Sequence, residues 1–147
     1  MLGDGTLTDQ PVPQLVGGGT LPWKSLPSRG FDGYQTCGIL TNGTLACWGY
    51  NNYGQLGDGT LVTNSGGPKA VLGGGNYTMV ETGAGHTCAI RTDSGLYCWG
   101  LNNYGQLGVG STINQLAPTA VWYGGVWSVV RTGNTHTCGI RASGQLW

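Results

Sequence analysis

The sequence predicts an all-β protein built from β-propeller blades, in which short antiparallel strands form small sheets. Glycine contributes 30 of the 147 residues, and 6 tryptophans and 7 tyrosines accompany it, a combination typical of tight turns between well-packed strands. A unit of about 51 residues occurs three times. No stretch has the periodicity and the caps of an amphipathic helix. Several short strands per unit at this period indicate propeller blades, as part of a larger propeller or repeat array.

The repeat is clearest in one long phrase. Cys-Trp-Gly-x-Asn-Asn-Tyr-Gly-Gln-Leu-Gly begins at Cys47 and returns at Cys98, about 51 residues later. A second phrase, His-Thr-Cys-x-Ile-Arg, begins at His86 and at His136, with a weaker copy at Gln35. We therefore interpret residues 1–147 as a single repeat region. Its copies cover approximately residues 2–55, 56–106 and 107–147, and the last copy is truncated.

Short aromatic and β-branched segments between turn residues predict the strands of each copy. The clearest are residues 77–81, 86–91, 96–99 and 127–131. Turns are expected at residues 41–43, 92–95 and 142–144. The Asn-Gly pair in the first of these turns is a strong hairpin signal.

The two phrases together resemble the repeat of the regulator of chromosome condensation family, and the resemblance covers essentially the whole chain. It implies a propeller, usually of seven blades, and it implies that Trp48 and Trp99 pack between blades. Members of that family include a nucleotide exchange factor on chromatin, ubiquitin-ligase domains and a β-lactamase inhibitor, so the fold does not determine the function. Three blades do not close such a ring. We expect further blades of a longer chain, or further copies of this one, as partners.

Four cysteines are predicted to form two disulfides. Cys37 and Cys47 are ten residues apart, as are Cys88 and Cys98, and each pair flanks a hairpin turn. Directly opposed residues of two antiparallel strands have Cβ atoms about 4.5–5.5 Å apart, close to what a disulfide needs. The alternative is buried free thiols. A zinc site is disfavoured because no short Cys-x-x-Cys spacing occurs.

The fifth cysteine has no partner by the same rule. The rule would pair Cys138 with position 148, one beyond Trp147. We therefore expect Cys138 to be unpaired or to pair beyond the end of this chain, and we interpret the sequence as a segment of a longer repeat array. The alternative is a 147-residue protein with an unpaired thiol.

Disulfides predict an oxidising compartment, and therefore an extracellular or cell-surface location. Two glycosylation sequons agree with it, and they place N-linked glycans on Asn42 and Asn76. This location argues against a nucleotide-exchange role.

The charge content excludes several classes of partner. Only 8% of the residues are charged, and 6 basic residues balance 6 acidic ones. A phosphate backbone needs a basic field, so we expect no nucleic acid. The chain also lacks a polybasic patch and a long apolar run, so we expect no membrane insertion.

The candidate chemical groups are few. His86 and His136 have the residue types of a metal ligand or a general base, but they occupy equivalent repeat positions and Gln35 takes that position in the first copy, which favours a structural role. Asp4 and Asp58 lie in Leu-Gly-Asp-Gly-Thr loops, where one carboxylate is too few for calcium and a turn-forming role is preferred. We expect no metal and no cofactor.

The remaining aromatic residues are candidates for core packing. Trp23, Tyr77 and Trp127 align between the copies. Tyr53 and Tyr104 could stack on sugars or partner proteins, but core packing is the preferred interpretation for these two as well. Paired carboxylates, a nucleophile elbow and a phosphate-binding loop cannot be identified, so the chain is not predicted to be an enzyme.

These observations favour a non-catalytic extracellular repeat scaffold that makes protein–protein contacts and forms a structural unit of a surface filament or coat. Head-to-tail association that fails to close gives a filament, and closed association gives a ring. The alternative is a secreted recognition propeller that binds a protein or glycan through its face loops. Residues 61–64 and 112–115 differ between the copies, as that alternative requires.

Overall fold

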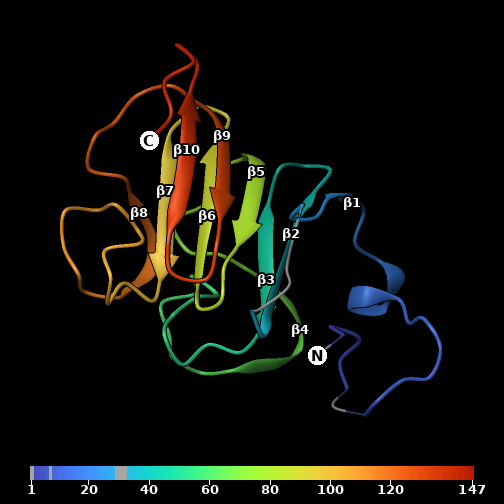
Figure 1. The fold of residues 1–147 in the computed structure, drawn as a ribbon. Coiled ribbons are helices and arrows are strands. Elements are labelled where there is room, and N and C mark those ends of the chain that lie inside the picture. The colour runs from blue at the N-terminus through green and yellow to red at the C-terminus, as the bar shows by residue number, and fades with distance from the viewer. Residues whose placement is uncertain (1, 7, 29–32) are drawn as a thin grey trace.

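The computed structural model describes residues 2–6, 8–28 and 33–147, and its strands form three antiparallel sheets (Figure 1). The first sheet has the strand order β1-β2-β3-β4, the second has β5-β6-β7-β8, and the third pairs β9 with β10. The strands are β1 (Trp23–Ser25), β2 (Gln35–Leu40), β3 (Leu45–Gly49), β4 (Asn64–Ala70), β5 (Tyr77–Thr82), β6 (His86–Arg91), β7 (Leu96–Gly100), β8 (Gln115–Ala120), β9 (Trp127–Thr132) and β10 (Thr137–Arg141). One 3-10 helix, η1 (Val16–Gly19), precedes them. The all-β prediction is confirmed.

The hairpins form where the turn residues predict them. β2 and β3 are joined by the turn that contains Gly43, whose φ of 86° favours glycine and whose N–H donates to the carbonyl of Leu40 at 2.9 Å. The predicted strands at residues 77–81, 86–91, 96–99 and 127–131 correspond to β5, β6, β7 and β9. Residues 29–32, near the place where the first copy is longer than the others, lie outside the described residues.

The last strand of each larger sheet, β4 or β8, was not predicted. β4 contains Pro68 and β8 contains Pro118, and a proline within a run of residues argues against a central strand. Each of these strands pairs with only one neighbour, β3 or β7. At such an edge the missing N–H of proline is tolerated, so both strands form although each contains a proline.

The sheets and the repeat copies are out of phase. Strands β1, β2 and β3 lie within residues 2–55, whereas β4 lies within residues 56–106. In the same way β8 comes from the third copy and completes the sheet that the second copy begins. Each four-stranded sheet therefore takes its outermost strand from the following copy.

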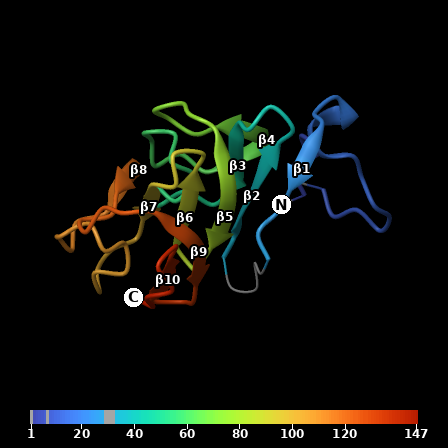
Figure 2. The ribbon, with the colours of Figure 1, turned by 90° about the horizontal axis from the view of Figure 1, so that it is seen from above.

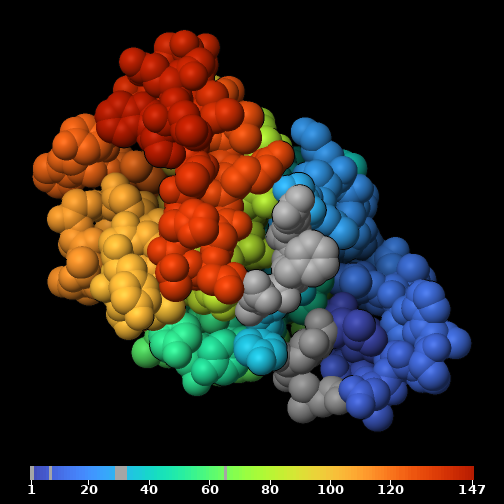
Figure 3. Space-filling model, in the orientation of Figure 1, coloured from blue at the N-terminus to red at the C-terminus, as the bar shows by residue number. Residues whose placement is uncertain are grey.

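The sheets pack against one another in chain order, and the core lies between them (Figure 2). β2 contacts β5 across the first interface, and β5 and β6 contact β9 across the second. One cluster of buried apolar side chains joins the first two sheets, and a second cluster joins the last two. In Figure 3 the orange and red C-terminal segment covers the middle of one face of the molecule. The interfaces between blades, rather than the individual sheets, hold the apolar core.

Candidate interaction surfaces

Two disulfides close the hairpins of the first two sheets. The structure joins Cys37 to Cys47 and Cys88 to Cys98, with the Cα atoms 4.1 Å apart in each pair. The register places the two residues of each pair directly opposite one another. All four cysteines are fully buried. The ten-residue spacing thus corresponds to two cysteines that face one another across a hairpin, as the sequence predicted.

Each buried tryptophan of the Cys-Trp-Gly phrase packs on a glycine near the start of its own copy. The indole Nε1 of Trp99 donates to the carbonyl of Gln55 at 3.0 Å, and the hydroxyl of Thr87 donates to the same carbonyl at 2.8 Å. A Cβ atom at Gly57 would lie 2.6 Å from that Nε1. Trp48 has the same relation to Gly3. Trp99 therefore lies between the first and second sheets, within the apolar cluster that joins them. Trp48 contacts Gly3 and Trp23 of its own copy, so its predicted place between two blades stays a prediction.

Beside the third sheet, an open cavity lies at the position that corresponds to that of Trp99 between the first two sheets. A cavity of about 620 Å³ lies between the second and third sheets, and we call it the C-terminal groove. The residues that define it are mostly apolar: Leu96, Cys98, Leu107, Val121, Trp127 and Gly139. Trp147 lies at its border, with its ring 5.5 Å from that of Tyr123.

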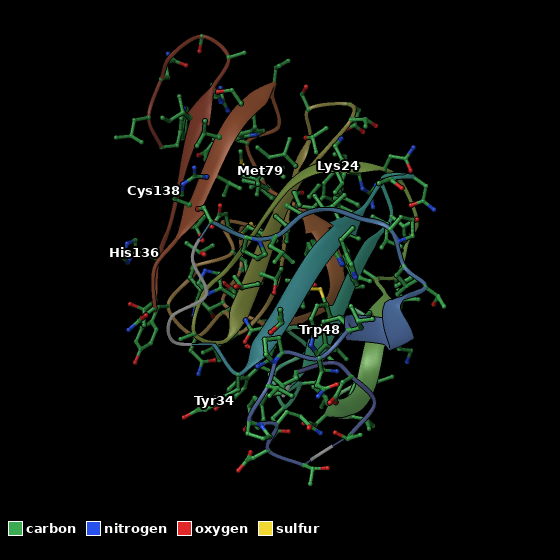
Figure 4. All side chains as sticks on the ribbon, turned by 90° about the vertical axis from the view of Figure 1, so that its right-hand side faces the viewer. Lys24, Tyr34, Trp48, Met79, His136 and Cys138 are labelled. Atoms are coloured by element: carbon green, nitrogen blue, oxygen red, sulfur yellow. A yellow bond between two sulfur atoms is a disulfide. The ribbon has the colours of Figure 1, made fainter. Side chains whose placement is uncertain are left out.

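Cys138 and His136 lie on the exposed edge beside this groove. Figure 4 shows both at the outer side of the third sheet, away from the first sheet and its Trp48. Cys138 is a free, exposed thiol on β10. Along the same edge Gly139 and Trp147 exchange backbone hydrogen bonds of 2.9 and 2.8 Å, so a third strand begins there.

The histidine position links one blade to the next. His86 is fully buried, and its Nε2 lies 3.0 Å from the hydroxyl of Thr137 in the third sheet. Burial lowers the pKa of His86 to about 4. Gln35, at the equivalent position of the first copy, donates to the carbonyls of Gly83 and His86 in the second sheet. Gln35 and His86 therefore have structural roles between blades, while the equivalent His136 is exposed.

The aspartates organise their loops. One oxygen of Asp58 accepts from the N–H and hydroxyl of Thr60, and the other accepts from Lys69 at 2.8 Å. Burial raises the pKa of Asp58, but the hydrogen bonds from Lys69 and Thr60 outweigh it and hold the pKa below its ordinary value. Asp4 accepts from Thr6 in the same way. Within the described residues no group of three or more His, Cys, Asp and Glu side chains could hold a metal ion.

Two buried asparagines have structural roles that the sequence analysis did not assign. The side-chain oxygen of Asn51 accepts from the N–H of Leu56, and its amide donates to the carbonyls of Thr60 and Val62. Asn102 makes the equivalent bonds one copy later. The sequence did contain a signal for this role, because Asn51 returns as Asn102 in the repeated phrase. A polar residue that is repeated in this way has either an exposed binding role or a buried hydrogen-bonding role.

A charged link between the blades was also missed. Glu81 is buried, and its carboxylate accepts from Arg131 at 3.1 Å and from the hydroxyl of Ser28 at 2.8 Å. These three residues belong to the second blade, the third blade and the segment after β1. Glu81 and Arg131 occupy equivalent positions of successive copies, so the repeat places opposite charges side by side.

Tyrosines gather at one exposed end of the first two blades. Tyr34 is 78% exposed, and its ring lies 6.1 Å from that of Tyr50, which lies 6.2 Å from that of Tyr53. The preferred interpretation of Tyr53 and Tyr104 as core residues is wrong: both are exposed, Tyr104 by 76%. Tyr53 lies on the surface of a loop between blades. Tyr77 and Trp127 are buried, and Trp23 is partly buried with its ring 5.6 Å from that of Trp48.

The two sequon asparagines are exposed and adjacent. Gly43 follows Asn42 in the hairpin turn, and a Cβ atom at Gly43 would lie 2.8 Å from the Cβ of Asn76. The carbonyl of Gly43 also accepts from the N–H of Tyr77. Glycans on Asn42 and Asn76 would therefore emerge from one small area. In the described part of the chain no helix has the length and apolarity of a membrane span.

Comparison with known proteins identifies the repeats. Residues 42–90 and residues 80–106 match two models of the regulator of chromosome condensation (RCC1) repeat. The ultraviolet-B receptor UVR8 of Arabidopsis thaliana is 34% identical over 115 residues, which are 78% of this chain and 26% of the receptor.

Solved structures resemble the fold. Human WBSCR16 superimposes with a TM-score of 0.77 at 24% identity, over 94% of this chain and 37% of that one. Prp20p of Saccharomyces cerevisiae, described with its binding to Gsp1p and histones, superimposes with a TM-score of 0.67 at 21% identity, over 84% of this chain and 32% of that one. This chain thus spans about a third or less of these relatives, in which the matched blades belong to longer chains.

Proposed function

We propose, from the premise that this chain carries RCC1 repeats, that it is a non-catalytic extracellular scaffold whose blades join further blades through protein–protein contacts. The observation that carries the proposal is the apolar surface beside the third sheet. The third sheet has only β9 and β10, and the C-terminal groove beside it is lined by apolar side chains. An apolar surface of this kind is stabilised when another polypeptide covers it.

The proposed location outside the cell rests on two features. The Cys37–Cys47 and Cys88–Cys98 disulfides persist in an oxidising compartment. Asn42 and Asn76 are exposed in Asn-x-Thr sequences, so an oligosaccharide can be attached without unfolding a strand. Treatment of the native protein with an N-glycosidase is expected to lower its mass. An unchanged mass together with reduced cysteines would contradict the location.

The proposed absence of catalysis rests on what the ionisable groups contact. His86 faces Thr137, Asp58 is bound by Lys69 and Thr60, and Glu81 is bound by Arg131. Each of these groups stabilises a loop or an interface, so none is placed to act on a substrate. Turnover on a panel of glycoside, ester and peptide substrates would overturn this part of the proposal.

Electron microscopy of the native, unprocessed material tests the scaffold. Head-to-tail contacts between open arrays are expected to give continuous fibres or a coat, because a heterologous contact that does not close propagates. Discrete closed discs would instead mean that the blades complete a ring within a longer chain or a small oligomer. Discs would overturn the filament role, and ligand screening of the face loops would then follow.

A second candidate function, recognition of a glycan or protein, has one observation in its favour. Tyr34 and Tyr53 are exposed on either side of the half-buried Tyr50, and aromatic rings of this kind stack on sugars and partner side chains. Saturable binding on a glycan array, lost in the Tyr34→Ala variant and retained in the Tyr123→Ala variant, is the result expected of that function. No saturable binding would remove it.

A further inference from the structure

We infer that N-linked glycans join copies of this chain: the glycans on Asn42 and Asn76 of one copy bind the exposed tyrosines of the next. We call Tyr34, Tyr50 and Tyr53 together the tyrosine surface. The inference rests on the proposed extracellular location and on the scaffold function, and it names the chemistry by which one copy recognises another. The occupant of the tyrosine surface is the carbohydrate of a second copy.

The glycan sites and the tyrosine surface lie at opposite ends of the first sheet. The β2–β3 hairpin begins beside Tyr34, ends beside Tyr50 and turns at Asn42, with an unbroken register in between. β2 has 6 residues, so the two ends of the hairpin are about 20 Å apart. Figure 4 shows Tyr34 at one end of the sheet and Lys24, which lies in β1 near the turn, at the other. A second copy stacked in the same orientation therefore brings its glycans to the tyrosine surface of the first.

The tyrosine surface is held in place by the fold. The N–H of Tyr50 donates to the carbonyl of Tyr34 at 3.0 Å, and the N–H of Tyr53 donates to the side-chain oxygen of Gln55 at 3.0 Å. The ring of Tyr53 also packs against the second blade, because a Cβ atom at Gly85 would lie 3.2 Å from it. A surface that is ordered before binding loses less conformational entropy when a flexible oligosaccharide attaches to it.

The chemistry of the tyrosine surface fits an uncharged sugar. The two segments that carry the rings, residues 33–36 and 49–57, contain no charged residue. Each ring combines an apolar face with a polar hydroxyl at its edge, and a pyranose ring likewise combines an apolar C–H face with hydroxyl groups. The core of an N-linked glycan consists of such uncharged sugars. An acidic sugar or a phosphate would instead need a guanidinium or ammonium group as its partner.

The folding of a blade does not require the tyrosine surface. Gly85 and Leu101 take the positions of Tyr34 and Tyr50 one copy later, so the second blade folds without two of the three rings. A residue with a role inside the blade returns in the next copy, as Asn51 does. The rings that do not return are exposed or half-buried at one end of the first blade. Their role is therefore assigned to contact with another molecule.

The two glycan sites act together because they are adjacent. A Cβ atom at Gly43, the residue after Asn42, would lie 2.8 Å from the Cβ of Asn76. A single sugar stacked on an aromatic ring binds weakly. Two glycans that start from one small area raise the local concentration of sugar at the same tyrosine surface, and this strengthens the contact without any new protein interface.

The first test is glycan removal from the native, glycosylated protein. Analytical ultracentrifugation is expected to show association that increases with concentration, and N-glycosidase is expected to weaken it by about tenfold or more. The glycans that the enzyme releases, added to untreated protein, are expected to inhibit its association. Because the enzyme leaves an aspartate at each site, the double variant Asn42→Gln with Asn76→Gln repeats the test without a new charge. Unchanged association of that variant, or an untreated protein that stays monomeric, overturns the inference.

Two variants of the tyrosines separate the tyrosine surface from general effects. Tyr53→Ala removes a ring that contacts Tyr50, and it is expected to weaken the association of the glycosylated protein by about tenfold. Tyr104→Ala removes the equivalent ring one copy later, which is 76% exposed and has Leu101 at the position of Tyr50. Its association is expected to match that of the unaltered protein. Equal association of the two variants would contradict the inference.

The remaining outcomes distinguish this inference from the proposals on which it rests. A mass that N-glycosidase does not change removes the glycans, and the inference fails with them. Fibres that persist after complete glycan removal leave the scaffold in place and overturn only the inference. Binding of dextran without binding of the released glycans assigns the tyrosine surface to an external polysaccharide and overturns the inference. Glycan-dependent association into discrete discs supports the inference and removes the filament.

Discussion

At the scale of single residues, burial decides the role of the Gln35, His86 and His136 position. Gln35 donates to two carbonyls of the next blade, and His86 contacts the hydroxyl of Thr137. His136 is exposed. One repeat position thus holds a buried amide, a buried imidazole and an exposed imidazole, and burial lowers the pKa of the buried imidazole of His86 to about 4.

The buried imidazole makes stability depend on pH. The pKa of His86 falls from 6.5 to about 4 on folding, so the unfolded chain binds the proton first as the pH drops. The contribution to stability is complete above pH 6.5 and is lost between about pH 6.5 and 4, by up to about 3 kcal/mol. Urea unfolding at pH 7 and pH 4.5 measures the loss. We expect His86→Gln, which copies the residue of the first blade, to abolish most of it.

The exposed counterpart provides the control for this pH dependence. His136→Gln is expected to change the pH dependence of unfolding far less than His86→Gln, because it removes an exposed imidazole and leaves the buried one in place. An equal effect of the two substitutions would show that the burial of His86 is not the cause.

The cysteines give a second prediction at this scale. Iodoacetamide is expected to label one cysteine, Cys138, in the folded protein without reductant, and all five after reduction and unfolding. Intact mass measures the number of labels. Labelling of Cys37 or Cys88 before reduction would contradict the two disulfides.

The residues that could be predicted are those whose contacts lie within one hairpin. The ten-residue spacing of Cys37 and Cys47 implies opposition across a turn, and the structure has that opposition. Glu81 and Arg131 could not be paired from the sequence, because their contact depends on how two sheets stack. The exposure of Tyr53 depends in the same way on neighbours from another blade. The pairing of residues within a hairpin can be predicted from the sequence, whereas the contacts between blades cannot.

At the scale of elements, the loops that follow β3 and β7 support the strands of the next blade. The Asn51 loop carries Gly57 to the indole of Trp99, and the Asn102 loop carries Gly108 to the C-terminal groove. The hairpin strands followed from alternation and turns, whereas β4 and β8 did not, because Pro68 and Pro118 interrupt them. An edge position is a property of the sheet, which a single segment cannot reveal.

The close contact at Gly57 is testable against a glycine of similar conformation. Gly57→Ala strains a φ of 69° and pushes a methyl group to 2.6 Å from the Trp99 indole, so we expect a loss of at least about 2 kcal/mol. Gly105→Ala strains a φ of 73° with no atom within 4 Å and is expected to cost about 1 kcal/mol. Chemical denaturation measures both. Equal losses would mean that the contact with Trp99 is not tight.

At the scale of the whole molecule, stability is expected to decrease from the second sheet to the third. The second sheet has four strands and a packed interface on each side, while the third has two strands beside a groove. Amides of β6 and β7 should therefore exchange with deuterium most slowly, and those of β10 fastest among the named strands. Hydrogen exchange with mass spectrometry measures this order. Equal protection of β6 and β10 would contradict it.

The phase difference between copies and sheets also has a mechanical meaning. Because β4 of one copy lies along β3 of the copy before it, the boundary between copies is a ladder of backbone hydrogen bonds instead of a bare linker. β8 and β7 interlock the second and third copies in the same way. A pull on the two ends of such an array must break these ladders before any copy can separate from its neighbour. Tension applied to the ends is therefore transmitted from copy to copy through paired strands.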